Sequence, residues 1–249
     1  AYNVFAQTGT LFWATVPYTT PSHDGGHSIH IVVSSMASPA TVTLSMPANS
    51  SFTPLTLTLG SNSTDYFDFN TTMLSQVELS EWDQITKKGL LIQSTDNITA
   101  YMEVFSNFNS DIYALKGLNA LGKDFFVPFQ GTWANHDFSC TTTSCVQAYS
   151  HIEIVATENN TTVWITPKQD VYKEPALIHA AGVPYSIVLQ KGETYSTRAV
   201  DITAGSRPAG THITSDKPIA VSTSDDSMEI GGAYDLNGDQ MVPTNVSGS

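Results

Sequence analysis

The sequence is short of charged residues, and of basic residues above all. Charged residues make up 13% of the 249 positions, and ten Lys and Arg face 23 Asp and Glu, which gives a formal net charge of −13. Such a surface repels phosphate backbones and anionic lipid headgroups, so we expect no nucleic-acid partner. No apolar run approaches the ~18 residues that a membrane-spanning helix needs. We therefore also expect no membrane insertion.

Motifs that gather catalytic or metal-binding groups are missing as well. There is no Gly-x-Ser-x-Gly elbow, no His-Glu-x-x-His and no phosphate-binding glycine loop. His27 and His30 lie near Asp24, but residues three apart in a strand point to opposite faces. The stretch Asp235–Asp239 resembles the start of a calcium loop, but Gln240 stands where that loop needs glycine. We predict no catalytic residue, no metal site and no cofactor, and hence a protein that is not an enzyme.

Cysteine is almost absent. Cys140 and Cys145 are the two cysteines of the chain, and they flank four Thr and Ser residues in a loop-like stretch. A metal site would need more ligands than the nearby His136, so we expect a local disulfide rather than free thiols. That bond needs an oxidising compartment. The first residues, Ala1-Tyr2-Asn3, lack the basic and apolar regions of a signal peptide, as expected of a mature or trimmed product.

Potential glycosylation sites indicate the same compartment. The Asn-x-Ser/Thr pattern recurs in turn-like segments, where a bulky glycan can be accommodated, although abundant Ser and Thr raise its chance frequency. We predict a secreted glycoprotein or one at the extracellular surface. The candidate acceptors are Asn49, Asn62, Asn70, Asn97, Asn159, Asn160 and Asn245.

One long unit occurs twice in the chain. Residues 89–104 and 210–221 share their residue order, and Ile92 matches Ile213 at a spacing of 121 positions. Each copy reads as strand, polar turn and strand, which predicts a hairpin turning at 95–98 in the first copy and at 216–219 in the second.

Upstream of this stretch, short strands alternate with turn signals. Thr41–Met46 alternates hydroxyls with apolar side chains, which indicates a half-buried strand. We predict that it pairs with Ser28–Val33 and that Leu55–Leu59 pairs with Asp65–Phe69. The region 73–86 is predicted to be irregular.

About seven short strands per copy, without a long amphipathic helix, are typical of a β-sandwich. We predict an all-β fold of two tandem β-sandwich-like repeats. A β-propeller-like closed array is the alternative, but its repeats normally run about 40 to 50 residues. The predicted domains are residues 1–120, residues 121–237 and residues 238–249, the last being the opening strand of a third unit packed on the second.

The longest loops are the natural place for a binding surface on such a scaffold. The loop Gln130–Tyr149 combines Trp133, His136 and Phe138 with the expected disulfide, which would limit the ordering entropy lost on binding. We predict these three residues as ligand contacts, the alternative being that the bond only pins the loop. Trp13 is predicted in the core and Trp164 exposed, and the adjacent acids Asp225 and Asp226 are predicted to form a solvated turn.

Four spaced motifs carry a resemblance to a known family. They are Gly122–Pro128, Ile152–Pro167, Leu189–Tyr195 and Gly210–Val221. With them the chain resembles, from about Gly9 to Pro243, the N-terminal domain of IgGFc-binding proteins. The resemblance implies a module of large secreted, mucus-associated or surface glycoproteins that act in binding or adhesion, and it assigns no binding residue here.

These observations lead to one functional prediction and one alternative. We predict a non-catalytic binding or adhesion module of a mucus-type glycoprotein, with an extracellular protein or glycan as ligand. The alternative is a lectin-like carbohydrate-binding module attached to an enzyme, in which exposed Trp133 or Trp164 would stack on sugar rings.

Overall fold

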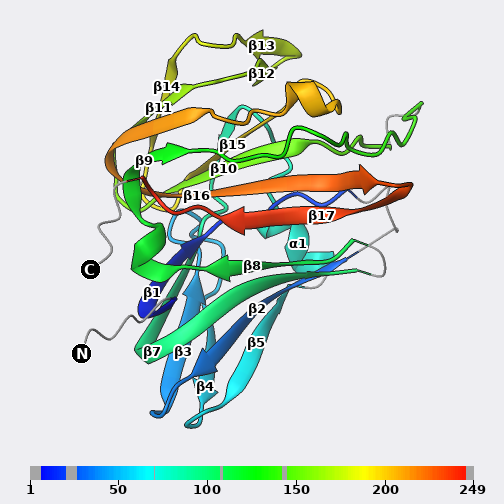
Figure 1. Cartoon of the computed structure of the whole chain (residues 1–249). Helices are drawn as coiled ribbons and strands as arrows, with labels where there is room; N and C mark the ends of the chain where they lie inside the picture. The colour runs from blue at the N-terminus through cyan, green and yellow to red at the C-terminus, as the bar shows by residue number, and fades with distance from the viewer. Residues whose placement is uncertain (1–6, 21–26, 70, 107–108, 142–144, 245–249) are drawn as a thin grey trace.

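The chain folds almost entirely into β-strands (Figure 1). The computed structural model describes residues 7–20, 27–69, 71–106, 109–141 and 145–244. In these residues, helical structure is limited to α1 (Thr71–Val77) and the 3-10 turns η1 (Gly117–Ala120) and η2 (Ala204–Ser206). No helix in the described ranges has the length and apolar character needed to span a bilayer.

Two sheets hold nearly all of the strands. The first comprises β1 (Thr8–Ala14), β2 (Ser28–Ser35), β3 (Ala40–Ser45), β4 (Leu55–Leu59), β5 (Thr64–Phe69), β7 (Leu90–Phe105) and β8 (Asp111–Leu115). The second comprises β6 (Gln84–Thr86), β9 (Gly122–Phe126), β10 (Ser150–Ala156), β11 (Thr161–Thr166), β14 (Tyr185–Leu189), β15 (Thr194–Arg198), β16 (His212–Ile230) and β17 (Ala233–Gln240). A small separate ladder pairs β12 (Val171–Lys173) with β13 (Leu177–His179).

The long strand β7 turns the first sheet into two layers. Residues 91–94 pair with β3, whereas residues 98–105 pair with β2. On its other edge β1 covers mainly the first part and β8 the second, and the register with β1 shifts between Gly9 and Leu11. The polar residues 94–97 lie at this shift, where the strand passes from one layer to the other.

Strand β16 repeats the arrangement in the second sheet. Residues 212–215 pair with β11 and residues 219–225 pair with β10, while the register with β9 shifts between Thr214 and Ile219. Each sheet therefore folds over itself around one shared strand. We call the two halves the first sandwich (β1 to β5, β7 and β8) and the second sandwich (β9 to β17). The predicted all-β fold of two sandwich-like repeats is confirmed.

The predicted hairpins are wrong, although most of the predicted strands are present in the structure. β2 and β3 do not pair with each other, because each pairs with a different part of β7. Likewise β4 pairs with β3 and β5 with β2, so the chain crosses between layers at both predicted turns. The segments 95–98 and 216–219 lie inside β7 and β16. Their polar residues mark a bend within a continuous strand, not a turn between two strands.

The region 73–86 is irregular only in part, between α1 and β6. Its first residues belong to α1, and β6 crosses to the second sheet, where Gln84–Thr86 pairs with Thr194–Ser196 of β15. Backbone hydrogen bonds therefore tie the first half of the chain to the second.

Strand β17 (Ala233–Gln240) is the last regular element in the part of the chain that the structure describes. Gly238–Gln240 belong to it, and β17 pairs with β16 much as β8 pairs with β7. In its pairing this stretch therefore corresponds to β8, and not to the opening strands β1 and β9. The division of the chain into residues 1–120, 121–237 and 238–249 stays a prediction.

Each sandwich encloses an apolar core. In β3 the alternation predicted from the sequence is present, because Val42 and Leu44 are buried and alternate with half-exposed threonine and serine residues. Full burial of such a side chain stabilises the fold by about 1.5–3 kcal/mol. The first core also receives Leu236 from β17, whereas the second centres on Phe125 of β9 and its neighbours.

A small apolar cluster joins the two sandwiches. Trp13 of β1 and Leu91 of β7 pack against Val155 of β10 and Ala220 of β16. The approach is close, since a Cβ on Gly89 would lie 2.5 Å from a methyl carbon of Val155. Trp13 is 3% exposed, as predicted for a core residue.

Ionisable groups are sealed into the same junction. His151 and Glu153 follow the alternation of β10 that also directs Val155 toward the first sandwich, and they are 2% and 1% exposed. Ser224 Oγ donates to Glu153 Oε1 at 2.8 Å and lies 3.2 Å from His151 Nδ1. Burial raises the pKa of Glu153 to about 7. Burial, with a smaller contribution from the charge of Arg198, lowers the pKa of His151 to about 3.

Replacing Glu153 with Gln should stabilise the protein at pH 8 and have little effect at pH 4.5. The unfolded chain loses the Glu153 proton near the ordinary pKa, whereas the folded protein holds it up to about pH 7. The free energy of unfolding of the unmodified protein therefore falls as pH rises through this window. Because Gln stays neutral, Glu153→Gln should gain about 2–3 kcal/mol at pH 8, measured by urea unfolding.

Glu158→Gln is the matched control, because Glu158 is exposed in the turn between β10 and β11. It should leave the free energy of unfolding unchanged at both pH values. Equal behaviour of the two variants at pH 8 would contradict the assignment of Glu153 as a buried acid whose pKa is raised.

Candidate functional site

The loop Gln130–Tyr149 lies along the far end of β16. Asn135 forms an isolated antiparallel bridge with Met228. Two backbone hydrogen bonds of 2.8 and 2.9 Å flank this bridge and tie residues 134–136 to residues 227–229. This part of the loop therefore continues the second sheet, which fixes the direction of the neighbouring side chains.

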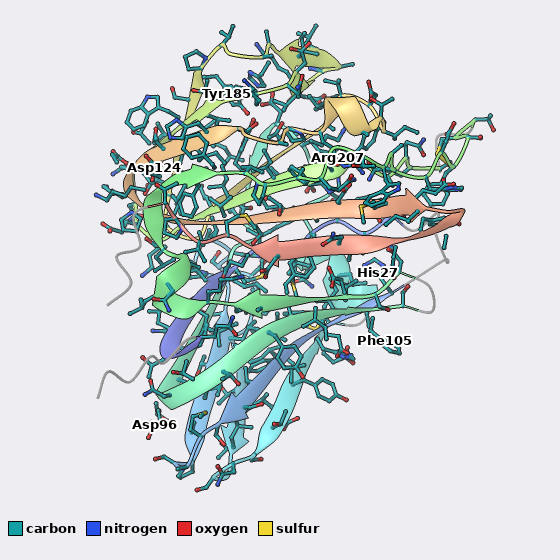
Figure 2. The ribbon with its side chains drawn as sticks, viewed as in Figure 1. His27, Asp96, Phe105, Asp124, Tyr185 and Arg207 are labelled. Atoms are coloured by element: carbon teal, nitrogen blue, oxygen red, sulfur yellow. A yellow bond between two sulfur atoms is a disulfide. The ribbon has the colours of Figure 1, made fainter. Side chains whose placement is uncertain are left out.

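A buried ion pair anchors the base of the loop. Arg207, labelled in Figure 2, is 2% exposed and donates from Nε and Nη2 to the two oxygens of Asp225, at 2.7 and 3.1 Å. Its Nη1 donates to the carbonyl of Trp133. Asn135 Nδ2 and Ser150 Oγ each donate to Asp225 Oδ1 at 2.8 Å. A bidentate pair with this many partners holds its members in one geometry.

The prediction that Asp225 and Asp226 form a solvated turn is wrong. They are 4% and 0% exposed, and both lie within β16. Asp226 accepts hydrogen bonds from Thr20 N–H at 2.7 Å and from Asn109 Nδ2 at 3.0 Å. Burial raises the pKa of Asp226, and these hydrogen bonds oppose the shift. Asp225 thus binds the loop to β16. Its neighbour Asp226 binds segments that flank the strands of the first sandwich.

His136 and Phe138 come together with Tyr234 of β17. The His136 ring stacks on that of Tyr234, with centroids 4.0 Å apart and planes at 10°, and the Phe138 ring meets both nearly at right angles. His136 Nδ1 lies 2.7 Å from Glu229 Oε2. We call His136, Phe138 and Tyr234 the aromatic cluster. All three side chains are partly exposed, so the cluster offers ring faces and a polar rim to solvent.

Trp133 lies in the same loop, with 42% of its surface exposed. Gln130 fixes its backbone, accepting from Trp133 N–H and donating to Trp133 O at 2.9 Å each. Gln130 also lines a cavity of about 320 Å³ between β16, β17 and residues 128–130. Two carboxylates line this cavity, and each is in an ion pair, Asp225 with a buried arginine and Asp239 with a lysine.

The disulfide joins Cys140 to Cys145, whose Cα atoms are 5.2 Å apart. Beside it, Asp137 Oδ1 accepts from Ser139 N–H at 2.8 Å and from Gln147 Nε2 at 2.9 Å, and these hydrogen bonds lower the pKa of Asp137. Together the bond and these contacts hold the two arms of the loop next to each other.

Most of the described glycosylation candidates are exposed. Asn62 lies in the β4–β5 turn and Asn97 at the bend of β7, while Asn159 and Asn160 form the β10–β11 turn. Asn49 is half-buried, and its side-chain oxygen accepts from residue 51. Asn70 and Asn245 lie outside the described residues. Occupancy of these sites stays a prediction.

The described part of the chain holds no group of three or more His, Cys, Asp or Glu side chains placed to bind a metal. His27 Nε2 lies 2.7 Å from Glu78 Oε1, whereas His30 lies between Asp68 and Glu103 at 3.6 and 3.4 Å. The two histidines thus have separate acidic partners. Asp24 lies outside the described residues.

No local pattern in the sequence indicates the partners of the loop. Tyr234, Asp225 and Arg207 come from distant segments, and the Asn135–Asp225 contact, for example, spans 90 positions. A scarce arginine in a chain of net charge −13 was the one available hint that a buried ion pair exists.

Replacing Arg207 with Met should destabilise the protein by about 3–5 kcal/mol, because it leaves Asp225 buried without its cation. Urea unfolding at pH 7 measures the loss, and Lys191→Met, at an exposed turn position, is the control that should change stability little. A loss below about 1 kcal/mol, the range of surface pairs, would show that the ion pair does not anchor the loop.

Comparison with known proteins identifies the family of the chain. The sequence profile described as IgGFc binding protein matches residues 112–249, which is more than half of the chain. The match spans the second sandwich and the candidate loop, and it confirms the resemblance seen in the sequence. A search of curated proteins found no match. The chain therefore belongs to the IgGFc binding protein family.

Proposed function

We propose that the protein is a non-catalytic extracellular binding or adhesion module of a larger mucus-type glycoprotein. Its contact surface is the loop of residues 130–149, with Trp133 and the aromatic cluster as the groups that touch the ligand. Membership of a family named for binding supports the class of function. The observation that carries the proposal is an exposed aromatic surface on this loop. Arg207, paired with Asp225, holds the backbone there through its hydrogen bond to the Trp133 carbonyl.

The energetics favour binding by this loop. Ordering a flexible loop opposes association, and a loop already held by an ion pair, a β-bridge and a disulfide avoids most of that cost. Tryptophan and tyrosine are enriched among the residues that dominate binding energy, because they bury a large area with few rotatable bonds. Trp133 at 42% exposure still has such area to bury.

The net charge of the protein limits the classes of ligand that it can bind. A net charge of −13 repels acidic partners at long range, so the ligand should be neutral or basic where it meets the loop. An extracellular protein surface with these properties is the ligand class we infer. Immunoglobulin Fc is the first protein to test because the family is named for it.

A lectin-like function is the second candidate. Trp164 on β11 is 44% exposed, and its cross-strand neighbours are Ser186 and Thr214. An exposed indole beside hydroxyl groups suits stacking and hydrogen bonding to a sugar. This surface is built from β11 and its neighbours, not from the loop 130–149, so the two candidates can be separated by mutation.

Trp133→Ala combined with Phe138→Ala should weaken ligand binding by roughly 10- to 100-fold, the effect of losing one or two dominant contacts. Binding is measured by surface plasmon resonance on immobilised Fc and on a glycan array, and circular dichroism checks the fold. Trp164→Ala is the matched control, since it also removes an exposed tryptophan, and it should leave binding unchanged.

Loss of binding with Trp164→Ala, and not with the loop variant, would replace the loop proposal with the lectin-like one. Turnover of a glycoside, ester or peptide panel well above the buffer rate would contradict the non-catalytic assignment.

A further inference from the structure

We propose that the outer face of β9 and β16 is a docking surface for a further sandwich unit of this repeat, joined in sequence after the second sandwich. The first sandwich already uses the equivalent face to bind the second. The inference is independent of the binding loop, because it involves a different face and a different partner.

The strand pairing defines which residues are equivalent. Trp13 lies opposite Leu91 where β1 pairs with β7, and Phe126 lies opposite His212 where β9 pairs with β16. Leu91 and His212 are 121 positions apart, which is the spacing of the repeat. Phe126 and His212 thus stand in the second sandwich where Trp13 and Leu91 stand in the first.

In the first sandwich this face is covered. Trp13 and Leu91 are 3% and 6% exposed because Val155 and Ala220 of the second sandwich pack on them. Gln240 Nε2 closes the contact from the same side by donating to the Trp13 carbonyl at 2.7 Å. In this interface, apolar side chains of the second sandwich pack against the cross-strand pair of Trp13 and Leu91 in the preceding sandwich.

In the second sandwich the equivalent face is open. Phe126 is 56% exposed and lies flat against the His212 ring, with centroids 4.4 Å apart and planes at 5°. His212 Nε2 is held 3.2 Å from Asp124 Oδ1. Figure 2 labels Asp124 at the margin of the second sandwich, on β9 as drawn in Figure 1. The face is thus an ordered aromatic surface rather than a single exposed side chain.

The chemistry of the covering residues identifies the occupant. At the repeat spacing of 121, Val155 and Ala220 correspond to Ser34 and Thr99 in the first sandwich. Hydroxyl-bearing residues are poor partners for Phe126, so another molecule docking through its first sandwich would lack the apolar contacts. A unit of the second type, with Val and Ala at these positions, has them.

The path of the chain is compatible with this occupant. Thr244 N–H donates to the Asp124 carbonyl at 2.9 Å, so the residues after β17 already run beside β9. After β8 the chain likewise runs along β1, where a Cβ on Gly117 would lie 3.3 Å from the Phe12 ring. The segment after β8 leads into the second sandwich, which covers β1.

The test appends a unit to the chain. Residues 117–244 are joined after Val242, which corresponds to Lys116 in the strand register of β8 and β17. In the appended unit Phe126 is replaced by Tyr, so that mass spectrometry distinguishes its peptides. Hydroxyl-radical footprinting then measures oxidation of the original Phe126, which should fall several-fold relative to the 249-residue protein.

The design contains its own controls. Trp164 of the original second sandwich should be oxidised at the same rate in the extended chain as in the 249-residue protein. The equivalent residue of the first sandwich, Thr43, stays half-exposed although that sandwich is covered. Val155→Glu in the appended unit should restore oxidation of the original Phe126, since a carboxylate cannot be buried against the ring without cost. Val188→Glu in the appended unit, at an exposed position of β14, should not restore it.

Three outcomes would overturn the proposal. The first is an unchanged Phe126 oxidation rate in the extended chain, whether or not the appended unit folds. The second is concentration-dependent protection of Phe126 in the 249-residue protein, which would make a second molecule the occupant. The third is protection of Phe126 by a hexasaccharide of glucose or N-acetylglucosamine, which would make the face a carbohydrate surface.

Discussion

The structure depends on two strands that each belong to two layers. β7 and β16 each provide both edges to different partners along their length, so four neighbouring strands are hydrogen-bonded to one continuous segment. A sandwich built this way closes without a hairpin between its layers. The same continuity carries the far part of β16 beyond the core, where it supports residues 134–136 and, through Asp225, the candidate loop.

Burial of polar groups links the junction to the site. Asp225 and Asp226 are adjacent in β16 but have different partners. Asp225 pairs with Arg207 at the base of the loop, and Asp226 accepts a hydrogen bond from Thr20, beyond β1 of the first sandwich. Glu153 and His151 lie in the same junction and are both held in neutral forms near pH 6 by burial. A network of this kind is costly if any partner is lost, so the loop and the junction should respond together to changes in β16.

Local patterns in the sequence were sufficient for the strands and insufficient for their partners. The alternation in Thr41–Ser45 and the short spacing of Cys140 and Cys145 are local, and both features appear in the structure. A polar stretch such as 95–98 fits either a turn or an exposed bend, and only contacts with β1 and β3 decide between them. Arg207, Asp225 and Tyr234 could not be assigned to the site because their partners are distant in sequence.

Strand β6 sets an order of events during synthesis. Thr86 precedes its partner Thr194 by 108 residues, which corresponds to roughly 5 to 20 s of translation. Until β15 has been made, β6 has no partner strand. Until β10 and β16 have been made, the Trp13–Leu91 face has no cover. The nascent first half therefore presents an unpaired strand edge and an apolar patch at the ribosome exit, two features that make unfinished chains prone to aggregation.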